Sequence, residues 1–330
     1  MSIDARDLLM ALGESAASSG SALAQRFGVT RAAIWKQIEQ LRSLGVPVTA
    51  RPGEGYRLVR TINLLDASAI SMAMNTRYAL SDCPIAVHWQ IDSTNSEMLR
   101  RAPSHKGNAA VCFSELQSAG RGRRGRSWHM PLGGGLAFSI LRRFESSMTA
   151  LAGLSLAVGI GVVRGLSDLG LAGLGIKWPN DIQVRDRKLA GILVELGGDA
   201  LGPCHAVIGI GINVHLDSQA SQHIDQPWTD IASMSSHPPD RNRLAGCLLA
   251  RVFEALDQFA ESGFGAFVDE FAKYDLLRGQ RVEILHGRDK PEGVAVGVDH
   301  AGRLRVLTTS REILVDSGEV SVRKAIGATP

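Results

Sequence analysis

The stretch GRGRRGRSW, Gly120–Trp128, combines four arginines with three glycines and ends on a tryptophan. Arginine carries a permanent charge on a planar group that matches phosphate and carboxylate, and glycine lets a backbone approach a ligand closely. The stretch has no GK[ST] element and no helix is predicted after it, so it is not a Walker A loop. By composition alone, a solvated basic loop or a nucleic-acid contact is the simpler interpretation. The chemical alternative is a loop that closes over an anion.

Three further stretches carry residues that could take part in chemistry. In Lys177–Leu196 a rigid Trp-Pro-Asn-Asp turn precedes Lys188, which begins an almost uncharged strand. This lysine is either an edge residue with its charge in water or a cation directed into a pocket. The DSTN stretch, Asp92–Asn95, lies between a predicted strand and a predicted helix, which by itself indicates only a helix N-cap. The GIGIN stretch, Gly209–Asn213, places glycines in a strand, where they allow close backbone approach.

The four motifs in this order resemble the biotin protein ligases, and GRGRRGR-x-W together with KWPND is highly specific to that family. The resemblance extends over essentially the whole chain, and with the N-terminal segment described below it is to the bifunctional ligases that also repress transcription. It implies that the biotin carboxylate attacks the α-phosphate of ATP, giving biotinoyl-5′-AMP and pyrophosphate. A lysine amine of a biotin carboxyl carrier protein then attacks this adenylate. Biotin and ATP are thus the implied substrates, and Mg²⁺ is expected to accompany ATP.

The resemblance also assigns roles to individual residues. Those expected to contact biotin are Ser93, Thr94, Asn95, Gln117, Arg121, Gly122, Arg123 and Lys188. Those expected to contact ATP or the adenylate are Arg121, Arg123, Trp128, Asn180 and Asn213. The chemical step is assigned to Arg123, Lys188 and Asp181, and its two cations would offset the repulsion between a carboxylate and a triphosphate. No metal site is predicted in the protein itself, and a role of Asn180 and Asp181 with magnesium or with the acceptor lysine stays open.

The first sixty residues have the pattern of a winged helix-turn-helix. Thr30 is placed to cap a helix, and Ile34, Ile38 and Leu41 recur at the spacing of one buried helix face. The VTARPGEGYRLV stretch that follows reads as two strands around a tight turn. A basic helix beside a basic hairpin is the electrostatic pattern of a DNA-binding module, although a helical hairpin that only packs on its neighbour is the alternative. The side chains expected to contact DNA are Arg31, Lys36, Gln37 and Gln40.

The remaining elements predict an α+β protein with two more domains. A helical connector over Thr61–Leu80 precedes strands and helices whose irregular order favours a mixed sheet. Strands are predicted at Ile85–Ile91, Ala110–Leu116, Leu136–Leu141, Leu189–Leu196 and Ala206–Val214, and long helices at Ala150–Leu169 and Asn242–Glu261. After Leu277, short strands separated by turns predict a small SH3-like β-barrel. The predicted domains are a winged helix-turn-helix at 1–62, a biotin- and ATP-binding catalytic domain at 63–277 and the barrel at 278–330.

Composition places the chain among globular proteins. It has 330 residues, of which 45% are hydrophobic and 21% charged, and a formal net charge of +3 that is too small to identify a partner. The four cysteines have neither metal nor disulfide spacing. The N-terminus lacks a signal pattern, and the apolar run Leu151–Val163 is too short to span a bilayer. A cytoplasmic protein with no membrane role is therefore expected.

Three functions stay open on the sequence. The first is a ligase that also binds operator DNA and represses biotin genes, as a homodimer promoted by its ligand. The second is a ligase whose N-terminal module is only structural. The third is a ligand-sensing repressor without catalysis, which the complete Arg, Lys and Asn set argues against. A lipoate ligase would share the core fold, but the arginine stretch and KWPND are not expected there.

Overall fold

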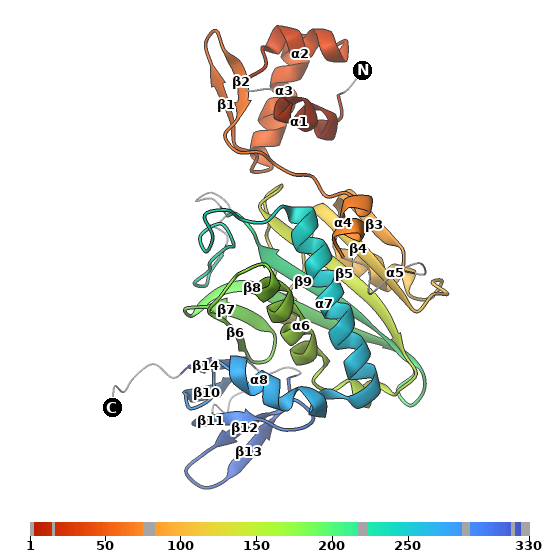
Figure 1. The fold of residues 1–330 in the computed structure, drawn as a ribbon, viewed down its shortest axis with the longest axis vertical. Coiled ribbons are helices and arrows are strands. Elements are labelled where there is room, and N and C mark those ends of the chain that lie inside the picture. The colour runs from red at the N-terminus through yellow and green to blue at the C-terminus, as the bar shows by residue number, and fades with distance from the viewer. Residues whose placement is uncertain are drawn as a thin grey trace.

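The structure is a computed structural model that describes residues 3–14, 17–74, 83–216, 224–285, 291–317 and 321–324. Three parts follow one another along its long axis (Figure 1): a small N-terminal group of helices with a hairpin, a central sheet with helices, and a C-terminal sheet. The α+β class is confirmed. The order of the three parts along the chain also agrees with the prediction.

The N-terminal part has the predicted helix-turn-helix and hairpin. Its elements are α1 (Ala5–Gly13), α2 (Gly20–Phe27), α3 (Arg31–Ser43), β1 (Val48–Arg51) and β2 (Gly55–Leu58). The Thr30 side chain accepts a hydrogen bond of 3.2 Å from the backbone amide three residues later, so α3 begins at the predicted cap. Gly28 ends α2 with a φ of +64°, which glycine adopts without strain. Ile34, Ile38 and Leu41 are buried, which confirms the inner face of α3.

A seven-stranded mixed sheet forms the central part. Its strands are β3 (Ile85–Ile91), β4 (Ala109–Gln117), β5 (Gly135–Phe144), β6 (Leu174–Lys177), β7 (Asp181–Val184), β8 (Arg187–Gly198) and β9 (Cys204–Asn213). The strand order is β3-β4-β5-β9-β8-β7-β6. Strands β3 and β4 are parallel, and every other neighbouring pair is antiparallel. All five strands predicted for this region are present.

Helices cover both faces of this sheet. They are α4 (Ala67–Ala73), α5 (Thr94–Arg101), α6 (Leu154–Asp168), α7 (Arg241–Ser262) and α8 (Val268–Tyr274), with short 3-10 turns at Met148–Leu151 and Phe264–Phe267. Alternate residues of β4 face opposite layers, as a pleated strand requires. Ala110 and Cys112 pack with Met98 of α5, whereas Val111 and Phe113 belong to the large core that α6 and α7 also line. The two long helices lie side by side on that face (Figure 1).

One helical stretch among the described residues, Met148–Asp168, is long and apolar enough to cross a membrane by length and composition. Two-thirds of its apolar window, 67%, is buried inside the protein. The stretch is longer than the apolar run singled out in the sequence, because only Ala152 and Gly153 separate the 3-10 turn from α6. Its apolar residues fill the core between the sheet and α7.

The connector between the first two parts differs from the predicted helix over Thr61–Leu80. Helix α4 begins only after Asp66, whose side chain caps it, and residues 75–80 lie outside the described residues. Residues 61–66 are not helical because their backbone groups form hydrogen bonds with side chains from distant parts of the chain. The Leu65 amide donates to the Glu115 carboxylate at 2.5 Å, and the Leu64 carbonyl accepts from Asn242 at 3.0 Å. The buried ion pair of Glu115 with Arg241, 2.8 Å, completes this anchor of the connector.

The C-terminal part is a five-stranded antiparallel sheet. Its strands are β10 (Arg281–Leu285), β11 (Glu292–Val298), β12 (Leu304–Leu307), β13 (Glu312–Val315) and β14 (Ser321–Lys324). The order is β13-β12-β11-β10-β14, so the predicted cluster of short strands is confirmed. Within the described part of the chain no ladder joins β13 to β14, and closure into an SH3-like barrel therefore stays a prediction.

Candidate active site

A pocket of about 260 Å³ opens at the centre of the mixed sheet, where the four motifs meet. Its walls come from the start of α5, the end of β4, the loop after β4, the first half of β8 and the end of β9. The residues predicted to contact biotin or ATP that line it are Ser93, Thr94, Asn95, Gln117, Arg121, Gly122, Arg123, Trp128, Asn180, Lys188 and Asn213. Asp181, predicted for the chemical step, reaches the pocket only through its ion pair with Lys188.

The turn of Ser93, Thr94 and Asn95 supplies buried polar groups to one end of the pocket. Ser93 occupies the N-cap position of α5, yet its side chain makes no capping hydrogen bond, so the simple N-cap interpretation does not explain it. The Thr94 amide donates to Gln117 Oε1 at 2.8 Å, and its hydroxyl lies 2.7 Å from Ser139 Oγ. Each of the three turn residues is less than 5% exposed. Polar groups held this deep are preorganised to meet a polar ligand.

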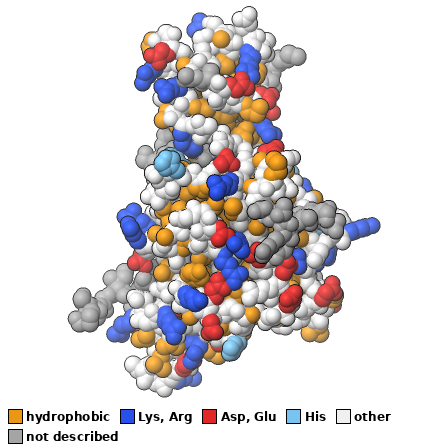
Figure 2. Space-filling view, viewed as in Figure 1, with side chains coloured by type: hydrophobic (Ala, Val, Ile, Leu, Met, Phe, Trp, Pro, Cys, Tyr) orange, Lys and Arg blue, Asp and Glu red, His pale blue; other side chains and the backbone are white. Residues whose placement is uncertain are grey.

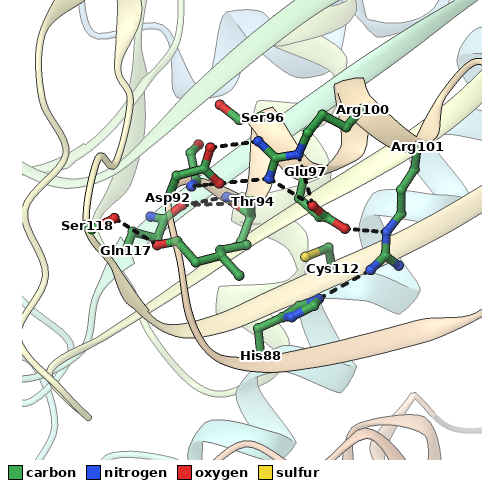
Figure 3. A network of polar contacts seen from close by, with 12 residues as sticks. His88, Asp92, Thr94, Ser96, Glu97, Arg100, Arg101, Cys112, Gln117 and Ser118 are labelled. Carbon is green, nitrogen blue, oxygen red and sulfur yellow. Dashed lines mark hydrogen bonds and ion pairs between the residues drawn. The ribbon is translucent and has the colours of Figure 1, made fainter.

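Asp92 and Arg100 hold this turn from outside (Figure 3). The Asp92 carboxylate accepts from the Ser93 amide at 2.8 Å and from both terminal nitrogens of Arg100 at 2.7 and 2.8 Å. The hydrogen bonds from Arg100 hold the pKa of Asp92 well below its usual value. Glu97 accepts a further hydrogen bond from Arg100, which fixes the guanidinium against α5. The DSTN motif therefore starts the helix with a charged pair on its outer side and a polar turn on its inner side.

The arginine-rich loop, residues 120–128, contributes six residues to the pocket lining and is called the clamp loop below. Its Arg121 forms an ion pair of 2.6 Å with Glu195 of β8. Its Arg123 donates to Asn180 Oδ1 at 3.1 Å and to the carbonyl of Ser317, which follows strand β13. Burial lowers the pKa of Arg123, while nearby Asp181 acts in the opposite direction. The two arginines carry charge that a bound anion would neutralise at close range.

Lys188 is the cation at the base of the pocket. Its Nζ lies 2.8 Å from Asp181 Oδ1 and 5.8 Å from the ring centre of Trp128, and its side chain is only 12% exposed. Of the two interpretations of this residue, the structure therefore supports the cation directed into a pocket. A Cβ at Gly191 would lie 3.3 Å from the lysine Nζ. Glycine at this position leaves the ammonium its space.

The glycines of GIGIN make room for two pocket residues. A Cβ at Gly211 would come within 2.4 Å of the Trp128 ring, and one at Gly209 within 2.1 Å of Asn95 Oδ1. These contacts are the close approach that glycine in a strand predicts. The buried Trp128 Nε1 has no hydrogen-bond acceptor among the described residues. Asn213 donates to the carbonyls of Lys188 at 3.3 Å and Thr229 at 3.0 Å, so it also ties β8 to the following loop.

Some residues that line the pocket, or that bond to its lining from behind, were not identified from the sequence. Glu195 accepts from Asn95 Nδ2 at 2.9 Å in addition to Arg121, and Ser139 donates to Asn95 Oδ1 at 2.6 Å. Trp228 and the segment 224–226 form another wall. An alternating strand pattern places Glu195 and Ser139 on one sheet face, but nothing in the sequence indicates which loop they meet. The pattern of residues along one sequence does not reveal a contact such as that of Arg121 with Glu195, which are 74 positions apart.

The side chains predicted to contact DNA lie on α3. Arg31, Lys36 and Gln40 are exposed, whereas Gln37 is half-buried and its Oε1 is enclosed without a partner among the described residues. Trp35, whose direction the sequence did not settle, is 58% exposed on the same helix. The outer face of α3 therefore combines positive charge, an amide and a large aromatic ring.

The chain matches three family models: the biotin/lipoate A/B protein ligase family at 87–213, an HTH domain at 5–57 and the biotin protein ligase C terminal domain at 278–323. The bifunctional ligase/repressor BirA of Salmonella typhimurium is 37% identical over 318 residues, which cover 96% of this chain and 97% of that protein. The biotin--[acetyl-CoA-carboxylase] ligase of Mycobacterium tuberculosis is 34% identical over 237 residues, covering 70% of this chain and 86% of that protein.

Among solved structures, the biotin protein ligase from Aquifex aeolicus in complex with biotin and ATP superposes with a TM-score of 0.62 and 28% identity. The match covers 73% of this chain and 99% of that one. An ATP-dependent ligase fold, a polar pocket lined by four Lys and Arg side chains and an N-terminal helix-turn-helix are thus found together in one chain. The chain belongs to the biotin protein ligases, and within them to the bifunctional ligase/repressor kind.

Proposed function

We propose that the pocket at the clamp loop forms biotinoyl-5′-AMP and that the protein passes its biotin to a lysine of a biotin carboxyl carrier protein. The observation that carries this assignment is the meeting of Arg121, Arg123 and Lys188 on one cavity whose other end is the buried turn 93–95. Biotin offers a polar ring system and a carboxylate. The buried polar turn can hydrogen-bond to the ring system, and the cations can pair with the carboxylate.

In the first step the cations bring two anions together. The biotin carboxylate oxygen bonds to the α-phosphorus of ATP while the bond from that phosphorus to the β-phosphate oxygen breaks, and pyrophosphate leaves. Negative charge accumulates on the α-phosphate oxygens during this exchange. Lys188 and Arg123 are already charged and positioned, so their stabilisation costs little reorganisation. Trp128 Nε1, buried and without an acceptor among the described residues, is a donor for an adenylate oxygen.

In the second step the carrier lysine amine bonds to the acyl carbon of the adenylate and AMP leaves. The amine must first lose a proton. Asp181, 2.8 Å from the Lys188 ammonium, holds that lysine in place and is the carboxylate we assign to this proton transfer. Asn180 keeps the turn beside it rigid, because its Nδ2 donates to the Ile192 carbonyl at 2.9 Å.

Magnesium fits this site as an ion that arrives with ATP. Among the described residues no three His, Cys, Asp or Glu side chains are grouped so that they could hold a metal ion. Mg²⁺ in nucleotide sites commonly takes most of its oxygens from phosphate and water and one or two from the protein. The side-chain oxygens of Asn180 and Asp181 would be the protein ligands of such an ion, as the alternative to the proton-transfer role of Asp181.

We further propose that α3 binds operator DNA and that ligand binding promotes a homodimer in the cytoplasm. Arg31, Lys36 and Gln40 are exposed on one helix beside the β1–β2 hairpin, which supports a DNA contact. Figure 2 shows Lys and Arg side chains interspersed with Asp and Glu over the face in view, so charge is not gathered into one large patch there. Because one recognition helix makes few phosphate contacts, binding by a two-fold symmetric dimer to two DNA half-sites is favoured.

The proposed domain limits are 1–62, 63–277 and 278–330. The separate N-terminal core of buried residues supports the first limit, and the change from helix α8 to short strands supports the second. The N-terminal core is not closed off, because Leu132 of the segment after the clamp loop is buried in it. The limit at 62 therefore separates sequence segments that remain in contact.

Exchange of labelled pyrophosphate into ATP tests the catalytic proposal. Biotin should make the exchange occur, because adenylate formation is reversible, and lipoate should not. Omitting the carrier protein leaves the exchange intact, which separates the first step from the second. A protein that binds biotin but shows no biotin-dependent exchange would retire the enzyme assignment and favour a ligand sensor.

A further inference from the structure

The Glu195 carboxylate joins the clamp loop to the buried turn. It accepts from Arg121 at 2.6 Å and from Asn95 Nδ2 at 2.9 Å, and its side chain is 23% exposed. Arg121 comes from the loop after β4 and Asn95 from the first turn of α5, so β8 supplies the only carboxylate that bonds both among the described residues. The ion pair spans 74 positions and the amide contact 100.

This carboxylate also sets the direction of a chain of hydrogen bonds. An ionised carboxylate only accepts, so Asn95 must turn its amide nitrogen to Glu195 and its oxygen to Ser139. The single Ser139 hydroxyl proton serves either of two acceptors, Asn95 Oδ1 at 2.6 Å or the Thr94 hydroxyl oxygen at 2.7 Å, and the Thr94 hydroxyl donates to Gln117 Oε1 at 3.3 Å. Gln117 Oε1 accepts from the Thr94 amide at 2.8 Å. Its amide nitrogen is therefore left to donate toward the pocket.

We infer that Glu195 is a positioning residue that presets the donors and acceptors of the biotin end of the pocket and holds Arg121 beside them. The inference rests on the assignment of turn 93–95 to biotin proposed above. Glu195 acts through Asn95 and Arg121 and does not line the pocket itself. Its loss should therefore weaken biotin binding and release the clamp loop, while the chemical step at Lys188 continues once both substrates are bound.

Glu195→Gln tests this with almost no change of volume. The two bonds fall on different oxygens, Oε1 from Arg121 and Oε2 from Asn95, and glutamine replaces one of these oxygens with an NH2 group that cannot accept, so one of the two hydrogen bonds is lost together with the charge. In pyrophosphate exchange the KM for biotin should rise tenfold or more, while kcat stays within about threefold. Cleavage after Arg121 by an arginine-specific protease should be faster in the ligand-free variant than in the wild type.

Glu270→Gln is the matched control. Glu270 also binds an arginine, Arg164, its side chain is 25% exposed, and it lies on α8 outside the pocket lining. This variant should keep the wild-type KM, kcat and cleavage rate. Glu195→Asp, which retains the charge but shortens the reach, should recover part of the biotin affinity if charge matters.

The outcomes separate this inference from the proposed function. If the wild-type protein shows exchange and Glu195→Gln has its KM and cleavage rate, or loses kcat with KM unchanged, Glu195 has no positioning role. A raised KM for biotin and faster cleavage in the control Glu270→Gln as well would also overturn the inference about Glu195. If the wild-type protein itself shows no exchange, the proposed function fails, and ligand-free cleavage still decides whether Glu195 restrains the clamp loop.

Discussion

At the scale of single residues, the site is built on charges that the protein has already partly satisfied. Lys188 is paired with Asp181, and Arg121 with Glu195, within the protein itself. Each pair keeps a buried or half-buried cation in place at the position where an anion would arrive. The substrate then adds to existing pairs, so little reorganisation is required when the reaction begins.

Replacing Lys188 with alanine should greatly reduce adenylate formation. The change removes a cation at the point where negative charge accumulates, and losses of comparable groups cost roughly 2.7–4 kcal/mol of transition-state stabilisation, or a 100- to 1000-fold fall in rate. Biotin-dependent pyrophosphate exchange measures this, with circular dichroism to confirm that the fold survives. Lys273→Ala, at an exposed position on α8, is the control and should be fully active. Near-normal exchange in Lys188→Ala would contradict the assignment.

The Asp92–Arg100 pair should make a stability contribution that depends on pH. The hydrogen bonds that Asp92 accepts from Arg100 lower the pKa of Asp92 in the folded protein. The pair therefore stabilises the fold at pH values above the ordinary Asp pKa of about 4. This stabilisation is lost as the pH falls toward the lowered pKa. Asp92→Asn should reduce the free energy of unfolding at pH 7 by about 1 kcal/mol or less, because both side chains are about half exposed.

Urea unfolding at several pH values measures this difference. The difference in free energy of unfolding between the wild type and Asp92→Asn should be constant from pH 8 to about pH 5. It should become smaller below about pH 4. A gap that is unchanged at pH 3 would show that the effect of the substitution does not come from the charged pair.

At the scale of elements, the clamp loop is the part of the site that has little regular secondary structure. It contains one short 3-10 turn, Arg123–Gly125, and Arg124 has a φ of +58°, which a non-glycine residue rarely adopts. Its ends are better held: the Trp128 amide donates to the Gly120 carbonyl at 2.9 Å, and the Trp128 ring packs over Gly211. Between these ends the Gly122 amide donates to the Arg126 carbonyl at 2.7 Å, and the Arg121 and Arg123 side chains bond to Glu195 and Asn180.

Protease sensitivity of the clamp loop should fall when substrates bind. Mutual repulsion of the arginines opposes a closed loop, and the charge of an adenylate relieves that repulsion. Cleavage between Arg121 and Arg126 should be rapid in the free protein and strongly suppressed by biotin with ATP. ATP alone and biotin alone serve as controls for simple ligand protection. Equal cleavage rates with and without both substrates would count against a closing loop.

At the scale of the whole molecule, the DNA-binding part is joined to the catalytic part by more than the connector. Leu132, just after the clamp loop, donates its amide to the Leu44 carbonyl at the end of α3 at 3.0 Å, and Arg60 donates to the Gly133 carbonyl at 3.3 Å. Figure 1 shows the two parts meeting at a narrow junction. The end of the recognition helix therefore contacts the segment that leaves the clamp loop.

DNA upstream of the organism's biotin biosynthetic genes should bind the protein more tightly when biotin and ATP are present. A monomer supplies one recognition helix, so useful affinity requires two copies on a palindromic site, and that affinity should fall steeply with salt because phosphate neutralisation supplies much of the energy. A gel shift with and without substrates measures both effects. Deleting 1–60 or changing Arg31 to alanine should weaken binding, whereas Arg311→Ala, in the turn between β12 and β13, should not.

The ligase function does not depend on this result. Should no ligand condition produce a shift, the repressor role would be withdrawn for this protein while the exchange assay still decided catalysis. The N-terminal part would then be a structural module that contacts the catalytic part through Leu132.

The sequence by itself determined the order of the elements and the identity of the motifs. Capping by Thr30, the end of α2 at Gly28 and the buried face of α3 depend on residues within one or two helical turns, so local pattern suffices to predict them. The five predicted strands were found for the same reason. The connector was predicted wrongly, because its backbone bonds to Glu115 and to the start of α7 far along the chain.

Only the tertiary structure decided how the motifs meet. The pairing of Arg121 and Asn95 with Glu195, and the fit of Trp128 over Gly211, depend on the register of β5, β8 and β9 and on the path of a loop between them. A shift of one residue in that register would turn Glu195 to the other face of the sheet. Contacts between residues this distant are set by packing of the whole sheet, and no local pattern in the chain records them.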